Sequence, residues 1–310
     1  MRWVTYTTGG AQERVGLVVD ETIYGLEPGT TMLDLLDEQD GLAAAQQRVR
    51  RSPWETIPFD TARLCAPLRP RSIRDCTGFL QHLRNCAAGG AFEVGQRYAQ
   101  VPAFYFSNAA ATVGPYDDVA ISPGSQRFDF ELEVCAVIGR AGANIERETA
   151  ESYLAGYTVL CDWSARDLQM LDMAMGLGPA KGKDSANTLG PMLVTPDEIE
   201  PHRSGKGYAL GMRAHVNGDL VGEGSWDQID WDFADMISYA SRGTRLVPGD
   251  VIGSGTVPTG CLMEHHAMNP DAFRGWLVPG DEVRLEVDGL GEICQKIVPS
   301  APVHPLSTGF

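Results

Sequence analysis

A succession of short strand-like segments is the feature that most constrains the fold of this chain. After residue 100 these segments are separated by turns that contain glycine or proline, and only 149–157 and 229–243 have the apolar spacing of helices. The strand candidates are 103–108, 130–139, 156–163, 190–196, 208–224, 250–257 and 281–298. Within 208–224, the Asn217-Gly218 dipeptide predicts a tight hairpin turn. Many strands with few helices predict a mainly β fold with a barrel or folded-sheet core.

The first 66 residues have the signals of a small α+β unit. Residues 3–8 and 14–26 are typical of short strands, and residues 30–51 are typical of a helix that Thr31 caps. The following "CAPLRPRS" carries two prolines, which interrupt regular structure. We therefore predict an N-terminal domain of residues 1–66 and a larger domain of residues 67–310.

Charge and cysteine content narrow the class of protein. The net charge of −16, without a cluster of lysine and arginine, argues against a nucleic-acid partner and gives no support to binding of acidic membranes. The N-terminus lacks the pattern of a secretory signal, and no apolar run is long enough to cross a bilayer. Seven cysteines without a CxxC pair favour reduced thiols. These features predict a cytoplasmic protein.

The strand-like segment "QRFDFELEVCAVIGR" contains an unusual pair of acidic residues. Glu131 and Glu133 are two positions apart, so both project from one face of a strand, with Asp129 on the same face. Alternating glutamates are also common on the solvent-exposed face of a sheet, so this segment alone does not distinguish a functional site from an exposed face. Asp162, at the end of the apolar run "GYTVLC", and Asp75 are two further carboxylates at prominent positions. If Asp75, Asp162 and the two glutamates meet, they form an all-oxygen site for Mg²⁺, Mn²⁺ or Ca²⁺.

Five motifs in a fixed order resemble those of the fumarylacetoacetate hydrolase family. They are "DFELEV", "DWSARDLQ", the lysine segment "GLGPAKGKD", the loop "GSGT" and "LVPGDEVRLEVDGLG". Together they extend over about residues 65–300. The resemblance implies a mixed β-sandwich roll with a barrel-like core and a small N-terminal α+β domain, usually in a homodimer.

The resemblance also implies a role for individual residues. Asp75, Glu131, Glu133 and Asp162 match the metal ligands of the family. His82 matches the histidine that activates water in hydrolytic members, and Glu264 matches the glutamate that orients it. The active-site lysine matches Lys183 on the pattern of the hydrolytic members and Lys181 on that of the shorter bacterial members; we prefer Lys183. Substrate contacts are expected from Gln169, Thr256, Tyr105 and Arg97.

The implied activity is hydrolysis of a carbon–carbon bond in a β-diketone or acylpyruvate-like acid. A bound Mg²⁺ or Mn²⁺ would polarise the carbonyl group, water deprotonated by His82 would attack it, and Lys183 would stabilise the oxyanion. The released carbanion would be held as a metal-bound enolate. The same centre also suits a decarboxylase, isomerase or dehydratase of a 2-oxo acid. A non-catalytic metal- or ligand-binding protein is a further alternative.

Overall fold

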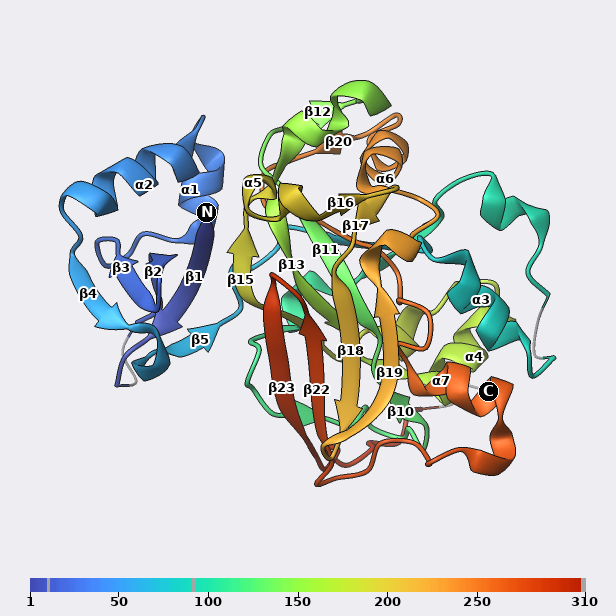
Figure 1. Cartoon of the computed structure of the whole chain (residues 1–310). Helices are drawn as coiled ribbons and strands as arrows, with labels where there is room; N and C mark the ends of the chain where they lie inside the picture. Colours follow the sequence, from blue (N-terminus) through green and yellow to red (C-terminus); the bar gives the residue numbers. More distant parts are fainter. Residues whose placement is uncertain (10–11, 91–92, 308–310) are drawn as a thin grey trace.

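The N-terminal part of the chain forms a lobe at one side of the molecule (Figure 1). The structure is a computed structural model and describes residues 1–9, 12–90 and 93–307. The lobe consists of β1 (Arg2–Thr7), β2 (Arg14–Val19), β3 (Thr22–Gly25), α1 (Met32–Asp37), α2 (Gly41–Arg51) and β4 (Glu55–Pro58). Thr31 caps α1 as predicted. The single helix expected over residues 30–51 is wrong, because Asp40 adopts a left-handed conformation with φ of 55° and separates α1 from α2.

One large sheet connects the lobe to the rest of the chain. Its strand order is β4-β3-β2-β1-β15-β13-β11-β21-β6-β7, so β1 joins the lobe to β15. The strands beyond β1 are β15 (Asn187–Val194), β13 (Leu154–Asp162), β11 (Leu132–Ile138), β21 (Val251–Gly253), β6 (Ile73–Cys76) and β7 (Phe104–Ser107). Two further strands join at the sides, β5 (Arg63–Cys65) on β1 and β8 (Thr112–Val113) on β15.

A second sheet of five strands packs against the first. Its order is β19 (Asp219–Ser225), β18 (Gly211–Val216), β22 (Glu282–Val287), β23 (Gly291–Val298) and β9 (Val119–Ala120). The predicted hairpin joins β18 to β19, and Asn217 and Gly218 have the positive φ angles, 56° and 86°, that such a turn requires. Strands β22 and β23 lie over β13 (Figure 1). This is the mixed, sheet-dominated α+β fold that the resemblance implies.

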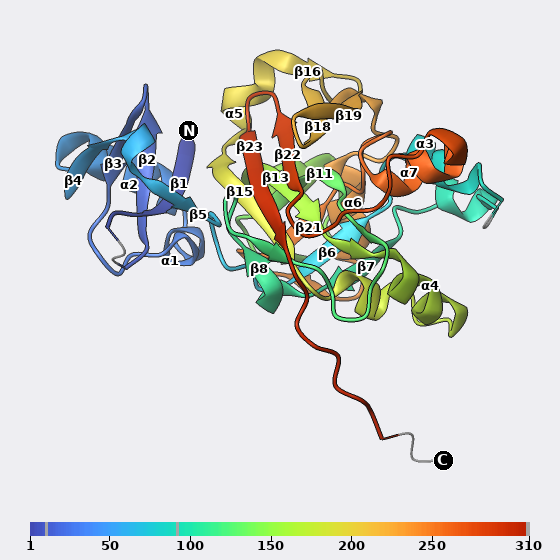
Figure 2. The same ribbon diagram turned by 90° about the horizontal axis from the view of Figure 1, so that it is seen from below.

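Helices and short pairs of strands complete the fold. The helices are α3 (Leu80–Ala87), α4 (Arg166–Ala174), α5 (Pro196–Ile199), α6 (Phe233–Ala240) and α7 (Leu262–Met268). The short strands are β10 (Phe128–Asp129) with β14 (Ser164–Ala165), β12 (Gly142–Ala143) with β20 (Arg245–Leu246), and β16 (Arg203–Ser204) with β17 (Gly207–Tyr208). The helix expected over residues 149–157 is a 3₁₀ helix, Arg147–Tyr153, after which β13 begins. Helices α3, α4 and α7 gather on the side opposite the lobe (Figure 2).

Each face of the large sheet has its own apolar core. Along β11, Val134 and Ala136 face the second sheet, whereas Cys135 and Val137 face the other way. The core on the second face also contains Trp3 and further side chains of the lobe, among them Val15, Leu17, Met32 and Leu35. The lobe and the large sheet therefore share one core. Among the described residues, no helix has the length and apolarity needed to cross a membrane.

Candidate active site

Four carboxylates meet across the consecutive strands β13, β11, β21 and β6 of the large sheet. Glu133 lies on β11, Asp162 ends β13, and Asp75 lies on β6. Together with Glu131, which directly precedes β11, each offers one oxygen atom, and these atoms lie within 4.8 Å of one another. Gly253, on β21 between β6 and β11, makes this approach feasible, since a Cβ there would lie 2.5 Å from Asp75 Oδ1. The structure thus brings together all four predicted metal ligands.

Lys183 is the only lysine at this cluster among the described residues. Its Nζ lies 2.5 Å from Glu131 Oε2 and 2.7 Å from Asp162 Oδ2, and its side chain is 3% exposed. Lys181, the alternative in the sequence, is 67% exposed and pairs with Asp184 at the surface. Both come from the 3₁₀ helix Ala180–Lys183, which turns one lysine inward and the other outward. The geometry therefore supports the preferred assignment of Lys183.

The cluster has more negative charge than its neighbours neutralise. Burial, with the nearby carboxylates of Asp75 and Glu131, raises the pKa of Glu133 well above its ordinary value. Burial likewise raises the pKa of Asp75, and it raises that of Asp162 to about 7 despite the opposing effect of Lys183. Only Glu131 has a lowered pKa, because Lys183 and Arg166 together outweigh its burial. A cation is the natural complement of such a site.

Arg166 is an important residue that the sequence reasoning missed. Its guanidinium group lies 2.7 Å from Asp129 Oδ2 and 2.8 Å from Glu131 Oε1, and it donates to Gln169 Oε1 at 3.1 Å. It is buried. It lies inside the motif "DWSARDLQ", between Asp162 and Asp167, and this position in the motif was the available signal. Arg166 holds Glu131 and Gln169 in fixed positions.

Asp129 lies outside the carboxylate cluster, and the expectation that one strand carries it together with Glu131 and Glu133 is wrong. The segment is not one strand, because β10 ends at Asp129 and β11 begins at Leu132. The Asp129 carboxylate instead accepts hydrogen bonds from the backbone N–H groups of Leu262 at 2.8 Å and Met263 at 3.0 Å. These free N–H groups belong to the first turn of α7, which favours a negative charge. Asp129 therefore fixes the position of α7.

His82 on α3 and Glu264 on α7 form a pair. His82 Nδ1 lies 2.8 Å from Glu264 Oε1, and Glu264 is fully buried. The other oxygen of Glu264 accepts from Asn85 Nδ2 at 2.6 Å and from the backbone N–H of Thr259 at 2.8 Å. Burial alone would lower the pKa of His82, but Glu264 raises it, to about 10. Asn85, one helical turn after His82, was not identified from the sequence.

His82 and three of the four clustered carboxylates, Asp75, Glu131 and Glu133, line one cavity of about 440 Å³. Its polar lining includes the predicted residues Asp75, His82, Tyr105, Glu131, Glu133, Gln169, Lys183 and Thr256, and its apolar lining includes Phe79, Leu83, Met170, Met173 and Met263. Tyr105 donates a hydrogen bond to Asp75 Oδ2 at 2.5 Å and another to Asp162. Arg97 is exposed and lies outside this lining. The other three predicted substrate contacts, Gln169, Thr256 and Tyr105, line the cavity.

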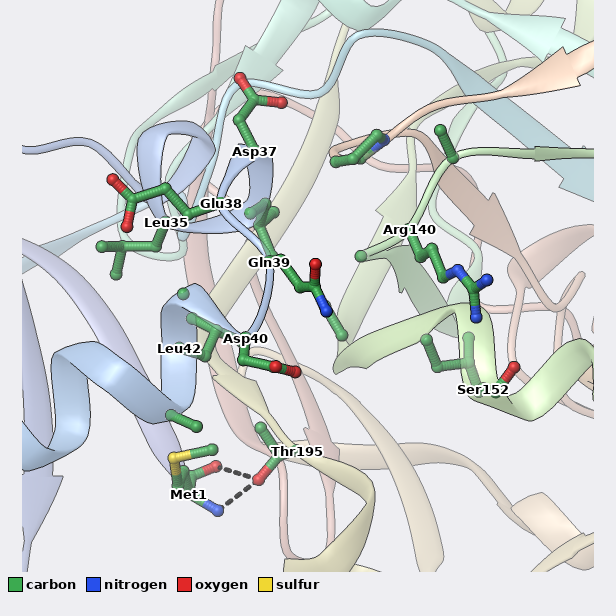
Figure 3. A pocket seen from close by; sticks show the side chains of 18 of the residues that line it. Met1, Leu35, Asp37, Glu38, Gln39, Asp40, Leu42, Arg140, Ser152 and Thr195 are labelled. Carbon is green, nitrogen blue, oxygen red and sulfur yellow. Dashed lines mark hydrogen bonds between the residues drawn. The ribbon is translucent and has the colours of Figure 1, made fainter.

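A larger cavity, of about 780 Å³, lies between the lobe and the large sheet (Figure 3). The segment from Asp37 to Leu42 forms one side, and Arg140 and Ser152 form the other. At one end, Met1 and Thr195 are joined by hydrogen bonds. Among the described residues that line this cavity, none is a predicted site residue. Size alone therefore does not locate the chemistry, and the smaller cavity is the candidate active site.

Relatives of known sequence match most of the chain. The human mitochondrial oxaloacetate tautomerase is 32% identical over 270 residues, which are 86% of this chain and 80% of the human protein. The mitochondrial oxaloacetate tautomerase of Xenopus laevis is 39% identical over 284 residues, 91% of this chain and 83% of that protein.

Solved structures share the fold. A fumarylacetoacetate hydrolase from Exiguobacterium antarcticum has a TM-score of 0.72 at 24% identity, covering 96% of this chain and 99% of that one. A maleylpyruvate hydrolase from Sphingobium, solved with manganese(II) and pyruvate, has a TM-score of 0.72 at 23% identity, covering 97% and 100%. The family model described as fumarylacetoacetate (FAA) hydrolase C-terminal matches residues 71–298. The chain is therefore an enzyme of the fumarylacetoacetate hydrolase family.

Proposed function

We propose that this protein interconverts the keto and enol forms of a 2-oxo acid of the oxaloacetate class. The observation that carries the proposal is that His82, which is bound to the buried Glu264, lines the same cavity as Asp75, Glu131 and Glu133, so that a proton-transfer group lies beside a candidate metal centre. The relatives named as oxaloacetate tautomerases match at least 86% of this chain at 32% identity or more, which favours this reaction over others of the family.

A divalent metal ion suits the carboxylate cluster. Asp75 Oδ1, Glu133 Oε1 and Asp162 Oδ1 are buried and have no hydrogen-bond partner among the described residues. A buried acceptor without a partner is costly, and a hard cation with oxygen ligands removes that cost. We therefore propose that Asp75, Glu131, Glu133 and Asp162 hold Mg²⁺ or Mn²⁺, with Ca²⁺ as a further candidate.

The reaction requires a proton to move between the carbon beside the carbonyl group and the carbonyl oxygen. A bound dication would draw electron density from that oxygen and so make the neighbouring C–H group more acidic. His82 would transfer the proton, held in orientation by Glu264. With a pKa of about 10, His82 carries a proton at neutral pH, which suits protonation of the enol at carbon. Lys183 and Gln169 would bind the carboxylate groups of the substrate, and Thr256 and Tyr105 would fix its position.

Hydrolysis of a carbon–carbon bond in an acylpyruvate-like acid is the second candidate. The observation in its favour is that Glu264 is itself held by two further donors, from Asn85 and Thr259, which is the support expected of a residue that orients a base. In this reaction the neutral form of His82 would take a proton from water. A decarboxylase or dehydratase would use the same metal site with different proton transfers.

Product analysis on the Mn²⁺-loaded protein separates these reactions. The enol form of oxaloacetate absorbs ultraviolet light more strongly than the keto form, so tautomerisation should speed the change in absorbance without any change in mass. His82→Ala should remove this acceleration, and Lys181→Ala, at the exposed lysine, should retain it. Two acids whose masses sum to substrate plus water would establish hydrolysis instead. Loss of carbon dioxide or water would establish a lyase, and no turnover of any substrate would contradict the proposed enzyme.

We further propose that the protein is a homodimer in the cytoplasm. The family resemblance favours a homodimer, and the sequence favours the cytoplasm. Sedimentation of the purified protein tests the first, since a single-chain mass would contradict it. The named relatives are mitochondrial proteins, so fractionation of the source cells tests the second.

A further inference from the structure

A second group of metal-binding side chains lies beside the candidate active site. Ligand atoms of His82, Cys86 and Cys261 lie within 4.8 Å of one another. Glu264 adds a carboxylate, with its Oε1 at 3.7 Å from Cys261 Sγ and 2.8 Å from His82 Nδ1. We propose that these four residues form a second metal site, suited to Zn²⁺ and distinct from the carboxylate cluster.

Two packed helices present the four ligands as two pairs. His82 and Cys86 are four residues apart on α3, so they lie on one face of that helix. Cys261 is the N-cap residue of α7, and Glu264 lies in its first turn. Helices α3 and α7 pack against each other, which brings the two pairs face to face. A site built on helices is held more firmly than one built on loops.

The spacing of the ligands already approaches that of tetrahedral zinc. At the tetrahedral angle, Zn–S and Zn–N bonds of about 2.3 Å and about 2.0 Å place a sulfur and a nitrogen ligand about 3.5 Å apart. Cys86 Sγ lies 3.8 Å from the ring nitrogens of His82, and Cys261 Sγ lies 3.7 Å from Glu264 Oε1. The contact that must widen is His82 Nδ1 to Glu264 Oε1, where the metal ion would replace a shared proton.

The two sites select different metals through their chemistry. The carboxylate cluster offers oxygen alone, which suits Mg²⁺ and Mn²⁺, whereas two sulfur atoms and an imidazole nitrogen suit Zn²⁺. His82 and Cys86 line the cavity, so a metal ion can reach the site from solvent, and Cys261 lies behind them, fully buried. Binding would release the thiol protons of Cys86 and Cys261 and the imidazole proton, so zinc affinity should rise with pH.

Zinc at this site would stop the reaction. The metal would occupy His82 Nδ1 and the carboxylate of Glu264, and so would replace the contact that orients His82 for proton transfer in the proposed function. This consequence rests on the proposed function; binding of the metal does not. Zinc would then inhibit the Mn²⁺-loaded enzyme without displacing Mn²⁺ from the carboxylates.

Cobalt(II) replaces zinc as a spectroscopic probe in the test. Cobalt bound to thiolates has a charge-transfer band in the near ultraviolet, and cobalt bound to carboxylates lacks it. The metal-depleted full chain should develop this band, and Glu133→Gln, in the carboxylate cluster, should retain it. Cys86→Ser, Cys86→Ala and Cys261→Ser should lose it while their circular dichroism stays unchanged. No band in the unaltered protein, or a band that persists in all three cysteine variants, would overturn the site.

The inhibitory consequence has its own measurement. Zinc titrated into the Mn²⁺-loaded enzyme should abolish turnover, and Cys86→Ser should need at least about tenfold more zinc, the effect typical of losing support at a metal site. Equal sensitivity of both proteins would overturn inhibition through this site. If no 2-oxo acid is turned over, the proposed function fails, and the cobalt spectrum still decides whether the site exists.

Discussion

Replacement of Lys183 by methionine should destabilise the metal-free protein strongly. Lys183 Nζ is the cation between Glu131 and Asp162, at 2.5 and 2.7 Å, and all three side chains are buried. Methionine has a similar length and no charge, so the variant keeps the packing and leaves two carboxylates facing each other. Removing one partner of a buried ion pair costs about 3 to 5 kcal/mol in free energy of unfolding.

Lys181→Met is the matched control. The two lysines are two residues apart in one 3₁₀ helix, but Lys181 is 67% exposed and its partner Asp184 is 38% exposed. An exposed pair contributes about 0 to 1 kcal/mol. At about 2 to 4 °C per kcal/mol, we expect Tm to fall by about 6 to 20 °C in Lys183→Met and by no more than about 4 °C in the control.

Thermal unfolding of both variants, measured once with a chelator and once with Mn²⁺, tests the electrostatic role of Lys183. With Mn²⁺ present, the difference between the variants should narrow, because a dication bound by the carboxylates supplies the positive charge that Lys183→Met has lost. Equal loss of stability in the two variants would refute the electrostatic role of Lys183. A difference that Mn²⁺ does not reduce would refute the assignment of the cluster as a metal site.

Three further predictions concern proton transfer and charge. His82→Asn should lower turnover by about 10²- to 10⁴-fold without changing Mn²⁺ affinity by calorimetry; unchanged turnover would exclude its role. Because burial raises the pKa of Asp162 to about 7, a proton stabilises the metal-free fold at low pH, and this stabilisation is lost as pH rises through 7. The rise in Tm on adding Mn²⁺ should therefore grow between about pH 5 and about pH 8, and a constant rise would contradict the raised pKa. Asn85→Ala removes a hydrogen-bond donor to Glu264 and should lower turnover by about tenfold. Arg84 is exposed on the same helix, so Arg84→Ala should leave turnover unchanged. Equal effects of the two variants would contradict positioning through Glu264.

Features with a local chemical cause were predictable from the sequence. The Asn217-Gly218 hairpin follows from backbone angles that few residues adopt, and the Thr31 cap follows from a hydroxyl group beside free N–H groups. The long central strands β11 and β13 follow from runs of apolar residues, whereas the short strands β4, β5, β6, β8 and β9 were not predicted. The carboxylate cluster was predictable in composition, because Glu131 and Glu133 share a motif, but its assembly rested on family resemblance.

Features that depend on distant parts of the chain were not predictable. Asp129 pairs with Arg166 and caps α7, which lie 37 and 133 residues further along the chain, and the strand is interrupted after it, so alternation along one strand did not predict its partners. The pairing of β1 with β15 joins Arg2 to Val194, and no local pattern indicates it. The break between α1 and α2 depends on Asp40 in a left-handed conformation, where aspartate is tolerated without being required.

The apolar core that the lobe shares with the large sheet also limits which substitutions this chain can accept. Trp3, Leu17 and Met32 of the lobe lie in the same cluster as Val137 and Leu160. Val137 lies on β11, which carries Glu133, and Leu160 lies on β13, which ends at Asp162. Close packing leaves little room for a change of volume on one side alone. Substitutions at these positions of the lobe should therefore need compensating substitutions in β11 and β13.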